Sequence, residues 1–339
     1  MSRIAINGFG RIGRAFFKLA LEEEDLDIIA INDLGDPENM AYLLKYDSVY
    51  GPSGLDVRVG DGKLVVNGKE VMLLSEKDPS KLPWKDLKID VALESTGFFA
   101  SYEKSQMHLQ AGAKRVVVSA PVKDAPPSGI VGATVIMGVN DEKLQTCDIS
   151  SNASCTTNAG GPLVTILDEK IGIEKAILNT VHGYTSTQNI VDGPNKKIRR
   201  GRAAGVNIVP SSTGAALATT KAYPALEGKF DGIALRVPVV SGSIVDITFI
   251  AKKDVTVEEV NEALVAAAHE DRWKGIFTVT NDPLVSTDIL GSPYASIVDL
   301  EMTRVVDGNL VKVLAWYDNE VGYTNTLVQH VITTAKYAK

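Results

Sequence analysis

The sequence is short of cysteine, of long apolar runs and of any surplus of positive charge. Only two of its 339 residues are cysteines, Cys147 and Cys155, which excludes a disulfide framework and suggests that any role of these thiols is reactive rather than structural. No apolar run approaches the roughly 18 residues of a membrane span, and residues 1–8 enter a strand pattern without a basic-then-apolar leader. We therefore expect a cytoplasmic protein without a membrane partner.

The charge balance excludes a further class of partner. Lysine and arginine number 35 against 42 aspartate and glutamate residues, which gives a net charge of −7. An acidic chain is poorly suited to nucleic acid as its main ligand, so we expect no dedicated nucleic-acid site. The hydrophobic fraction of 45% is enough for a sizeable core, and the length predicts about two domains.

Strand and helix patterns alternate through the first half of the chain. Residues 4–6 and 26–31 predict buried strands, and residues 11–24 between them have the apolar spacing of a helix. Short apolar strands separated by helices indicate an α/β fold with a parallel, doubly wound sheet. The turn pair Asn67-Gly68 predicts a hairpin inserted into this sheet at residues 64–71.

The second half has a different pattern, in which long strand-like runs follow one another with few helices between them. These runs are residues 176–181, 231–240, 243–251, 296–306 and 310–317. They favour an α+β domain with a largely antiparallel sheet and helices on one side. Thr256 and Glu259 have the spacing of a capping box, and residues 320–339 predict a final helix. The pattern changes near residues 148–153, where we expect a domain boundary.

A glycine motif between the first strand and the first helix indicates a dinucleotide site. Gly8, Gly10 and Gly13 are spaced so that the backbone can turn tightly and approach a pyrophosphate at the helix N-terminus. Asp33 lies at the end of the second strand, where its carboxylate can accept hydrogen bonds from the adenosine ribose. Because strand, helix and acid are all in register, a dinucleotide site is favoured over an ordinary glycine-rich turn.

Cys155 and His182 are the candidates for covalent chemistry. Cys155 lies among hydroxyl and amide side chains directly before a helical pattern, where a helix N-terminus would stabilise its thiolate. His182 ends a predicted strand, whereas His108, His269 and His330 fall in helical patterns and are expected at the surface or the edge of the core. Cys155 and His182 therefore form a plausible nucleophile–base pair.

A basic cluster, residues 196–202, stands out in this acidic chain. Its arginines suit an anion such as phosphate, although a solvated basic surface is the alternative. Arg236 is a single charge within an apolar strand pattern and needs a partner or a ligand.

Motifs along the whole chain resemble those of one family, the phosphorylating, NAD-dependent glyceraldehyde-3-phosphate dehydrogenases. The motifs are Ile6–Arg14, Leu44–Ser48, Glu94–Gly97, Ser151–Asn158, Thr213–Ala216, Arg236–Pro238 and Trp316–Glu320. The resemblance implies a Rossmann NAD-binding domain at 1–152, an α+β catalytic domain at 153–319 and a C-terminal helix at 320–339 that returns to the first domain. It also implies a homotetramer.

The same resemblance assigns roles position by position. It implies that Cys155 is the nucleophile and His182 the general base. It places the substrate phosphate on Thr185, Arg200 and Arg236, with Arg199 left open as the alternative to Arg200. It places inorganic phosphate on Ser154, Thr156, Thr213 and Gly214. The implied cofactor residues are Gly8, Gly10, Arg11, Ile12, Asp33, Lys77, Thr96, Ser119 and Asn319. No metal site is implied.

The implied reaction is the NAD-dependent oxidation of D-glyceraldehyde 3-phosphate, with inorganic phosphate, to 1,3-bisphosphoglycerate through a cysteine thioester. Asp33 favours NAD over NADP, because a 2′-phosphate would meet its negative charge. One alternative is erythrose-4-phosphate dehydrogenase, which Thr185 and Thr187 make less suitable. The other is a non-catalytic NAD- or RNA-binding regulator, against which the complete nucleophile–base pair argues.

Overall fold

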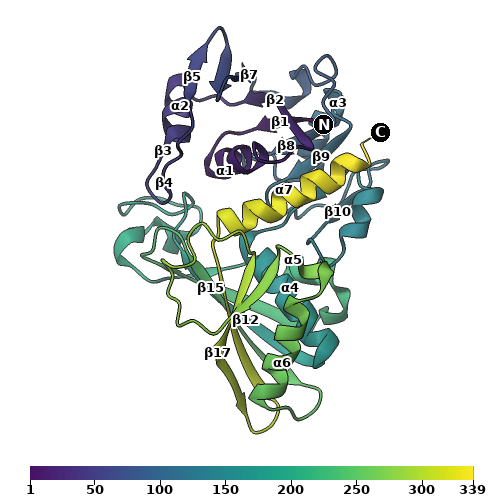
Figure 1. Ribbon diagram of the computed structural model, residues 1–339, viewed down its shortest axis with the longest axis vertical. Helices are drawn as coiled ribbons and strands as arrows, with labels where there is room; N and C mark the ends of the chain where they lie inside the picture. Colours follow the sequence, from purple (N-terminus) through teal and green to yellow (C-terminus); the bar gives the residue numbers. More distant parts are fainter. Residues whose placement is uncertain (339) are drawn as a thin grey trace. The chain divides into compact units, whose positions relative to one another are not determined.

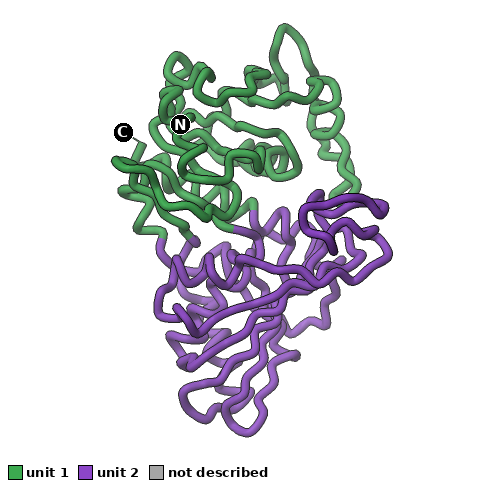
Figure 2. The backbone as a smooth tube through the Cα atoms, turned by 180° about the vertical axis from the view of Figure 1, so that it is seen from behind, with its two compact units in different colours: residues 1–135, 141–153, 324–339 green, residues 136–140, 154–323 purple. Residues whose placement is uncertain are grey.

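The computed structural model describes residues 1–338 and divides into two compact units, drawn in different colours in Figure 2. Unit 1 comprises Met1–Val135, Asp141–Ala153 and Thr324–Lys339, and unit 2 comprises Ile136–Asn140 and Ser154–Tyr323. Each unit has its own sheet with helices packed on it. None of the helices in residues 1–338 is both long and apolar enough to cross a lipid bilayer.

Unit 1 is built on a nine-stranded sheet with the order β10-β11-β9-β8-β1-β2-β7-β6-β5. Its strands are β1 (Ser2–Asn7), β2 (Leu26–Asn32), β5 (Val57–Gly60), β6 (Lys63–Val66), β7 (Lys69–Leu74), β8 (Val91–Glu94), β9 (Arg115–Val118), β10 (Gly132–Thr134) and β11 (Ile149–Ser151). Its helices are α1 (Arg11–Ala20), α2 (Pro37–Lys45), α3 (Tyr102–Gln110) and, from residue 324 onward, α7 (Val321–Lys336), while β3 (Tyr46–Asp47) and β4 (Gly51–Pro52) form a separate two-stranded ribbon.

The strands from β10 to β7 are all parallel, and their order β7-β2-β1-β8-β9-β11 is that of a doubly wound Rossmann sheet. This order reverses direction between β1 and β8, and ligands bind at such a switch point beyond the carboxyl ends of the strands. The predicted hairpin is confirmed as β6–β7, in which Asn67 and Gly68 both have positive φ angles. This hairpin extends the parallel sheet with an antiparallel edge.

Small residues on one face of this sheet make room for a large buried aromatic ring. Ala5, Ala30 and Ala92 come from the neighbouring strands β1, β2 and β8, and all three pack in one cluster with the buried indole of Trp84. Close packing of this kind is sensitive to small changes in volume. The three alanines therefore leave the space that the indole occupies.

Unit 2 has a seven-stranded sheet with the order β13-β14-β12-β15-β18-β17-β16. Its elements are β12 (Ile173–Gly183), β13 (Val209–Ser212), β14 (Phe230–Val237), β15 (Ser243–Ala251), β16 (Phe277–Thr280), β17 (Ser296–Val306) and β18 (Leu310–Tyr317), with helices α4 (Cys155–Lys170), α5 (Ala215–Ala222) and α6 (Val257–Ala268). The predicted strands are all present, and the sheet is largely antiparallel, with parallel pairing only between β12 and β14 and between β16 and β17. The three helices lie on one side of it (Figure 1).

The core of unit 2 is formed by the side chains that alternate along its strands and point to one face of the sheet. Alternate residues of β15 are buried, among them Val245, Ile247 and Phe249, and they pack in one cluster with Leu163 and Leu167 of α4. Helix α6 begins at the capping box that the sequence predicts, with both reciprocal hydrogen bonds present. The sheet thus supports α4, whose first residue is Cys155.

Candidate active site

The three glycines of the first turn each meet a different steric demand. Gly8 has a φ of +98°, and a Cβ atom on it would lie 2.5 Å from the amide nitrogen of Thr96. A Cβ on Gly13 would overlap the carbonyl of Gly8, whereas a Cβ on Gly10 would project into open space at the start of α1. Side chains are therefore excluded at positions 8 and 13, where two backbone segments meet. At position 10 the lack of a side chain leaves open the space that a pyrophosphate would occupy. The turn therefore fits a dinucleotide such as NAD.

Asp33 lies at the end of β2 and is tied to this turn. Its carboxylate accepts hydrogen bonds from the amides of Phe9 (2.6 Å) and Gly35 (2.8 Å). The acid that the sequence assigns to the ribose therefore also holds the glycine turn.

The other cofactor residues predicted in unit 1 are Arg11, Ile12, Lys77, Thr96 and Ser119. Arg11 pairs with Asp47 at 3.2 Å, and Lys77 is exposed. Ser119 follows β9, where its amide donates to the carbonyl of Glu94. These residues lie at or near the carboxyl ends of the parallel strands or in the first turn of α1.

Asn319, also predicted for the cofactor, belongs to unit 2. Its side-chain oxygen accepts hydrogen bonds from the amide of Gly242 (3.1 Å) and the hydroxyl of Ser243 (2.9 Å). The amide side chain is therefore held in a fixed orientation by the turn before β15.

Cys155 and His182 meet in unit 2. Helix α4 begins at Cys155, after Ser154 accepts the amide proton of Thr157 as the N-cap. The Sγ atom of Cys155 lies 3.3 Å from Nε2 of His182 at the end of β12. This distance is short enough for direct proton transfer between a thiol and an imidazole.

The electrostatics of this pair differ from the expectation of a helix-stabilised thiolate. Burial raises the pKa of the Cys155 thiol, and the charge of Arg236 and the amide and hydroxyl of Thr156 only partly oppose that shift. Burial, together with the charge of Arg236, lowers the pKa of His182 to about 3. Desolvation therefore favours the neutral thiol and the neutral imidazole over a thiolate–imidazolium pair.

The strand register explains why Arg236 reaches His182. The two residues are direct partners in the parallel pairing of β12 with β14, so their side chains leave the same face of the sheet. A guanidinium nitrogen of Arg236 lies 2.8 Å from Nδ1 of His182 and 3.1 Å from the carbonyl of Gly183, which is itself 2.6 Å from Nδ1. Arginine can only donate, so Nδ1 cannot accept from Arg236 and donate to Gly183 at the same time. The tautomer in which Nδ1 donates to Gly183 is the one in which Nε2 is unprotonated and faces the thiol as a base.

Thr185 and Arg200, both predicted to hold phosphate, are joined through Thr187. The hydroxyls of Thr185 and Thr187 are 2.9 Å apart, and Arg200 donates to Thr187 (3.0 Å) and to Ser211 (2.9 Å). Arg199 is exposed, whereas Arg200 is partly buried, so the geometry favours Arg200 as the phosphate ligand.

Arg200 and Arg236 are two cations that act on His182. Burial and the charge of Arg236 lower the pKa of Arg200, and both guanidinium groups lower the pKa of His182. Within residues 1–338 neither arginine forms an ion pair with a carboxylate, and Nε of Arg236 is buried without a hydrogen-bond partner. Two such cations favour an anionic ligand beside the thiol and the imidazole.

The residues predicted for inorganic phosphate fall into two groups. Ser154 and Thr156 flank Cys155, where the Ser154 hydroxyl lies 2.8 Å from that of Thr157. Thr213 and Gly214 lie at the start of α5, a helix that packs against α4. The hydrogen bonds of residues 1–338 connect only the first group to the turn of α4 that begins at Cys155.

Tyr317 lies in this site, although the sequence predicts no role for it. Its hydroxyl bridges those of Thr156 (3.0 Å) and Thr180 (2.8 Å), and its ring lies edge-on to His182 with centroids 5.9 Å apart. Burial raises the pKa of Tyr317, so its phenol stays protonated. The motif Trp316–Glu320 contains Tyr317 and is the one sequence feature that points to it. The motif does not predict the hydroxyl bridge, because the bridge joins three segments that are distant in sequence.

Comparison with known proteins gives a consistent result over the whole chain. Residues 2–102 match the family model for the glyceraldehyde 3-phosphate dehydrogenase NAD binding domain, and residues 154–319 match the model for the C-terminal domain. Proteins named glyceraldehyde-3-phosphate dehydrogenase from Clostridium acetobutylicum and Clostridium pasteurianum are 49% and 48% identical over all of both chains. That of Geobacillus stearothermophilus is 47% identical over 96% of each chain. The chain therefore belongs to the glyceraldehyde-3-phosphate dehydrogenase family, as its motifs predict.

Proposed function

We propose that Cys155 is the nucleophile and His182 the general base with which this chain oxidises glyceraldehyde 3-phosphate. Membership of the family makes the chain an NAD-dependent dehydrogenase. The observation that carries the assignment of roles is the distance of 3.3 Å between Sγ and Nε2, next to two arginines that pair with no carboxylate among residues 1–338.

The chemistry of the pair follows from its neutral resting state. The sulfur of Cys155 attacks the aldehyde carbon while its proton passes through Nε2 of His182 to the carbonyl oxygen, which gives a thiohemiacetal. His182 then takes the hydroxyl proton at Nε2 as hydride leaves the carbon and the thioester forms. When bound, NAD supplies the hydride acceptor for this oxidation. Inorganic phosphate then attacks the thioester carbon, and the bond to Cys155 breaks to release the acyl phosphate.

Anion binding and proton transfer are coupled in this arrangement. Substrate phosphate on Thr185, Arg200 and Arg236 places negative charge beside the two cations that lower the pKa of His182. The substrate phosphate therefore offsets the part of the lowering of the His182 pKa that comes from the two arginines, while burial, the larger cause, remains. Ser154, Thr156, Thr213 and Gly214 are the proposed donors to inorganic phosphate, since hydroxyl and amide groups suit an anion at the ends of α4 and α5.

Unit 1 is proposed as the NAD-binding domain and unit 2 as the catalytic domain. The expected domains at 1–152 and 153–319, with the C-terminal helix at 320–339 joined to the first, stay part of this proposal. The units differ from these bounds in placing residues 136–140 and 320–323 in unit 2 and Ala153 in unit 1. Gly8, Gly10 and Asp33 form the cradle whose sterics fit the dinucleotide. Arg11, Ile12, Lys77, Thr96, Ser119 and Asn319 are the proposed further contacts.

A homotetramer in the cytoplasm is the proposed state of the enzyme. Unit 2 exposes large apolar side chains over residues 190–208, where Ile198 is 88% and Val206 is 79% exposed. Apolar surface of this kind is typical of an interface with another copy of the chain. Sedimentation velocity would test it, and a monomer at micromolar concentration would contradict it.

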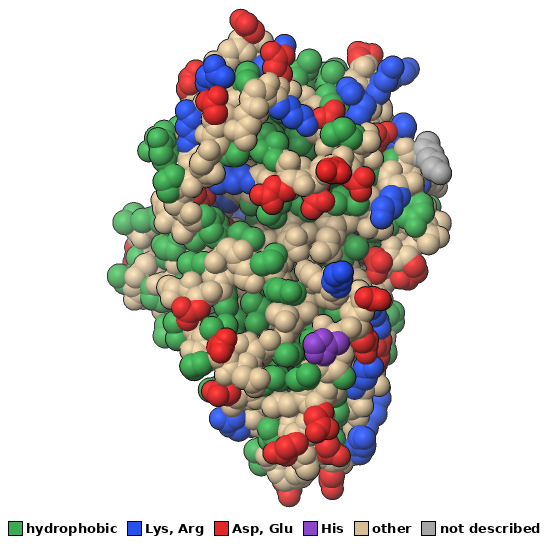
Figure 3. Space-filling model, viewed as in Figure 1, with side chains coloured by type: hydrophobic (Ala, Val, Ile, Leu, Met, Phe, Trp, Pro, Cys, Tyr) green, Lys and Arg blue, Asp and Glu red, His purple; other side chains and the backbone are tan. Residues whose placement is uncertain are grey.

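The deciding assay follows NADH formation after aldehyde, NAD and phosphate are mixed, with each component omitted in turn. We expect formation to depend on all three, and glyceraldehyde 3-phosphate to exceed erythrose 4-phosphate in kcat/KM. No turnover would favour a non-catalytic regulator. Against an RNA-binding role, Figure 3 shows Lys and Arg side chains interspersed with Asp and Glu on the displayed face.

A further inference from the structure

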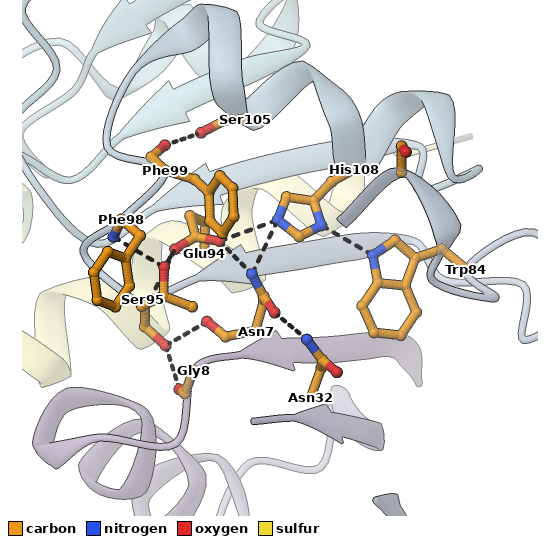
Figure 4. Close-up of polar contacts among 12 residues, drawn as sticks. Asn7, Gly8, Asn32, Trp84, Glu94, Ser95, Phe98, Phe99, Ser105 and His108 are labelled. Atoms are coloured by element: carbon orange, nitrogen blue, oxygen red, sulfur yellow. Dashed lines mark hydrogen bonds and ion pairs between the residues drawn. The ribbon is translucent and has the colours of Figure 1, made fainter. Parts of the chain in front are cut away.

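A buried polar network centred on Glu94 underlies the cofactor residues of unit 1, as Figure 4 shows. The Glu94 side chain lies at the end of β8 and is only 1% exposed. It accepts hydrogen bonds from Asn7 (2.5 Å), from His108 (3.1 Å) and from both the amide (2.8 Å) and the hydroxyl (2.5 Å) of Thr96. All of the donors belong to unit 1, and they come from three segments that are distant in sequence.

The hydrogen bonds determine the protonation of His108. Trp84 donates its indole N–H to Nδ1 of His108 at 3.0 Å, and an indole nitrogen can only donate. Nδ1 is therefore an acceptor, so the imidazole is neutral and its proton is on Nε2. Nε2 then donates to Glu94, which is left as a carboxylate with four donors. His108 is completely buried, contrary to the expected surface or core-edge position.

The network extends to the other strands that carry cofactor residues. Asn7 ends β1 directly before the glycine turn and accepts a hydrogen bond from Asn32 (2.7 Å), which precedes Asp33. Asn32 also exchanges two hydrogen bonds with the backbone of Glu76, next to Lys77. The hydroxyl of Ser95 donates to the carbonyl of Gly8 at 2.7 Å. One set of buried groups thus connects the ends of β1, β2 and β8.

We propose that Glu94 and His108 are positioning residues of the NAD site, which hold Thr96 and the glycine turn in the conformation that binds the cofactor. This proposal rests on the proposed role of Thr96 and the glycine turn in binding NAD. A buried carboxylate is costly unless every lone pair is satisfied, so its donors are held in one arrangement. Apolar side chains of the same volume would fill the space but would leave the direction of the Thr96 amide undetermined.

The test compares Glu94→Gln, His108→Leu and His108→Gln with wild type by calorimetric titration of the assembled enzyme with NAD. An amide at position 94 turns an N–H₂ group toward donors, so at least one of them loses its acceptor. We expect the Kd for NAD to rise about tenfold or more in Glu94→Gln and His108→Leu, which corresponds to about 1.4 kcal/mol. His108→Gln keeps a donor and an acceptor and should restore most of the affinity.

A matched control lies on the same helix. Ser105 is as deeply buried in α3 as His108, and its hydroxyl donates to the carbonyl of Phe99 without touching Glu94. Ser105→Ala should leave the Kd for NAD unchanged, although it also removes a buried hydrogen bond. In steady-state kinetics the two network variants should raise KM for NAD while kcat and KM for the aldehyde stay near wild type.

Two outcomes separate the failure of this proposal from that of the proposed function. If wild type binds NAD and folded Glu94→Gln and His108→Leu bind it equally well, the network has only a structural role. If wild type neither binds NAD nor forms NADH, the proposed function fails, and the positioning role fails with it. Should Glu94→Gln not fold, the two His108 variants decide between these outcomes, because they differ only in their hydrogen bonds to Glu94 and Trp84.

Discussion

At the scale of single residues, the site depends on how burial and charge are balanced around Cys155. The sulfur is at a helix N-terminus, which favours a thiolate, yet desolvation raises the pKa of the thiol. His182 is deprived of its proton by the same burial and by Arg236. Burial therefore favours a neutral thiol at Cys155, the proposed nucleophile.

Replacing the nucleophile tests the assignment most directly. Cys155→Ser should abolish dehydrogenase activity while NAD binding and folding stay close to wild type, because a serine hydroxyl without an activated base is a far weaker nucleophile. The measurement is NADH formation by the purified variant together with its thermal unfolding. Substantial turnover would remove Cys155 from the role of nucleophile.

Replacing the base should slow the reaction without altering the resting thiol. His182→Asn should lower kcat by about 10²–10⁴-fold, which is the usual contribution of a positioned general base. Because His182 is neutral at rest, the pH profile for alkylation of Cys155 should change little. A large rise in the alkylation pKa would instead reveal an imidazolium–thiolate pair.

Arg236→Leu should affect three measurable quantities. It should weaken binding of the phosphate-bearing aldehyde far more than binding of NAD, since a forked donor to the anion is lost. Loss of the positive charge should also raise the pKa of both Cys155 and His182, because that charge now lowers each of them. The rate of alkylation as a function of pH measures the pKa of the Cys155 thiol. An equal loss of affinity for cofactor and aldehyde would point to misfolding.

At the scale of elements, a hydrogen bond connects the glycine turn after β1 with the residue that follows β2. Asp33 accepts a hydrogen bond from the amide of Phe9, so the acid proposed to select the cofactor also stabilises the glycine turn. A substitution that removes the whole side chain therefore affects both functions. An isosteric amide affects them unequally, because Asp33→Asn removes the negative charge but keeps one of the two oxygen acceptors.

We expect wild type to favour NAD over NADP in kcat/KM, because a 2′-phosphate would meet the carboxylate of Asp33. Asp33→Asn should narrow this difference, because its kcat/KM should fall less with NADP than with NAD. Asp33→Gly should lose more activity with NAD than Asp33→Asn does, because the turn is also released. A wild type that prefers NADP would contradict this interpretation of Asp33.

At the scale of the whole molecule, a second buried histidine connects the C-terminal helix with the strand before Cys155. His330 of α7 is completely buried, with Nε2 at 2.7 Å from the Ser150 hydroxyl and Nδ1 at 3.0 Å from the side-chain oxygen of Asn152. All three belong to unit 1. Burial lowers the pKa of His330 to about 3, so the folded chain excludes a proton that the unfolded chain would bind.

This linkage predicts a loss of stability in acid. The stabilising contribution of neutral His330 is complete above the unfolded pKa of about 6.5 and declines as the pH falls toward 3, by at most about 1.4 kcal/mol per pH unit. His330→Gln should have a lower melting temperature at pH 7.5 and a shallower decline between pH 6.5 and 4.5. Scanning calorimetry across that range measures both, and parallel curves would exclude His330 as an acid-sensitive group.

Local chemistry and motifs were sufficient to predict much of this protein. The glycine spacing, the capping box at Thr256 and the turn pair Asn67-Gly68 act within a few residues, so their structures follow from the sequence alone. The family, the fold class and NAD as cofactor are confirmed for the same reason, since dense local motifs span the chain. The individual site residues stay predictions that the geometry supports.

Only the tertiary structure decided the environment of the chemical groups. A pKa depends on burial and on charges that other strands bring close, which is why the neutral state of Cys155 and His182 could not be inferred from a helix N-terminus. The hydroxyl bridge of Tyr317 and the buried positions of His108 and His330 depend likewise on partners far away in sequence. The motifs specify which chemical groups the chain carries. How far each group is removed from water depends on how the whole chain packs.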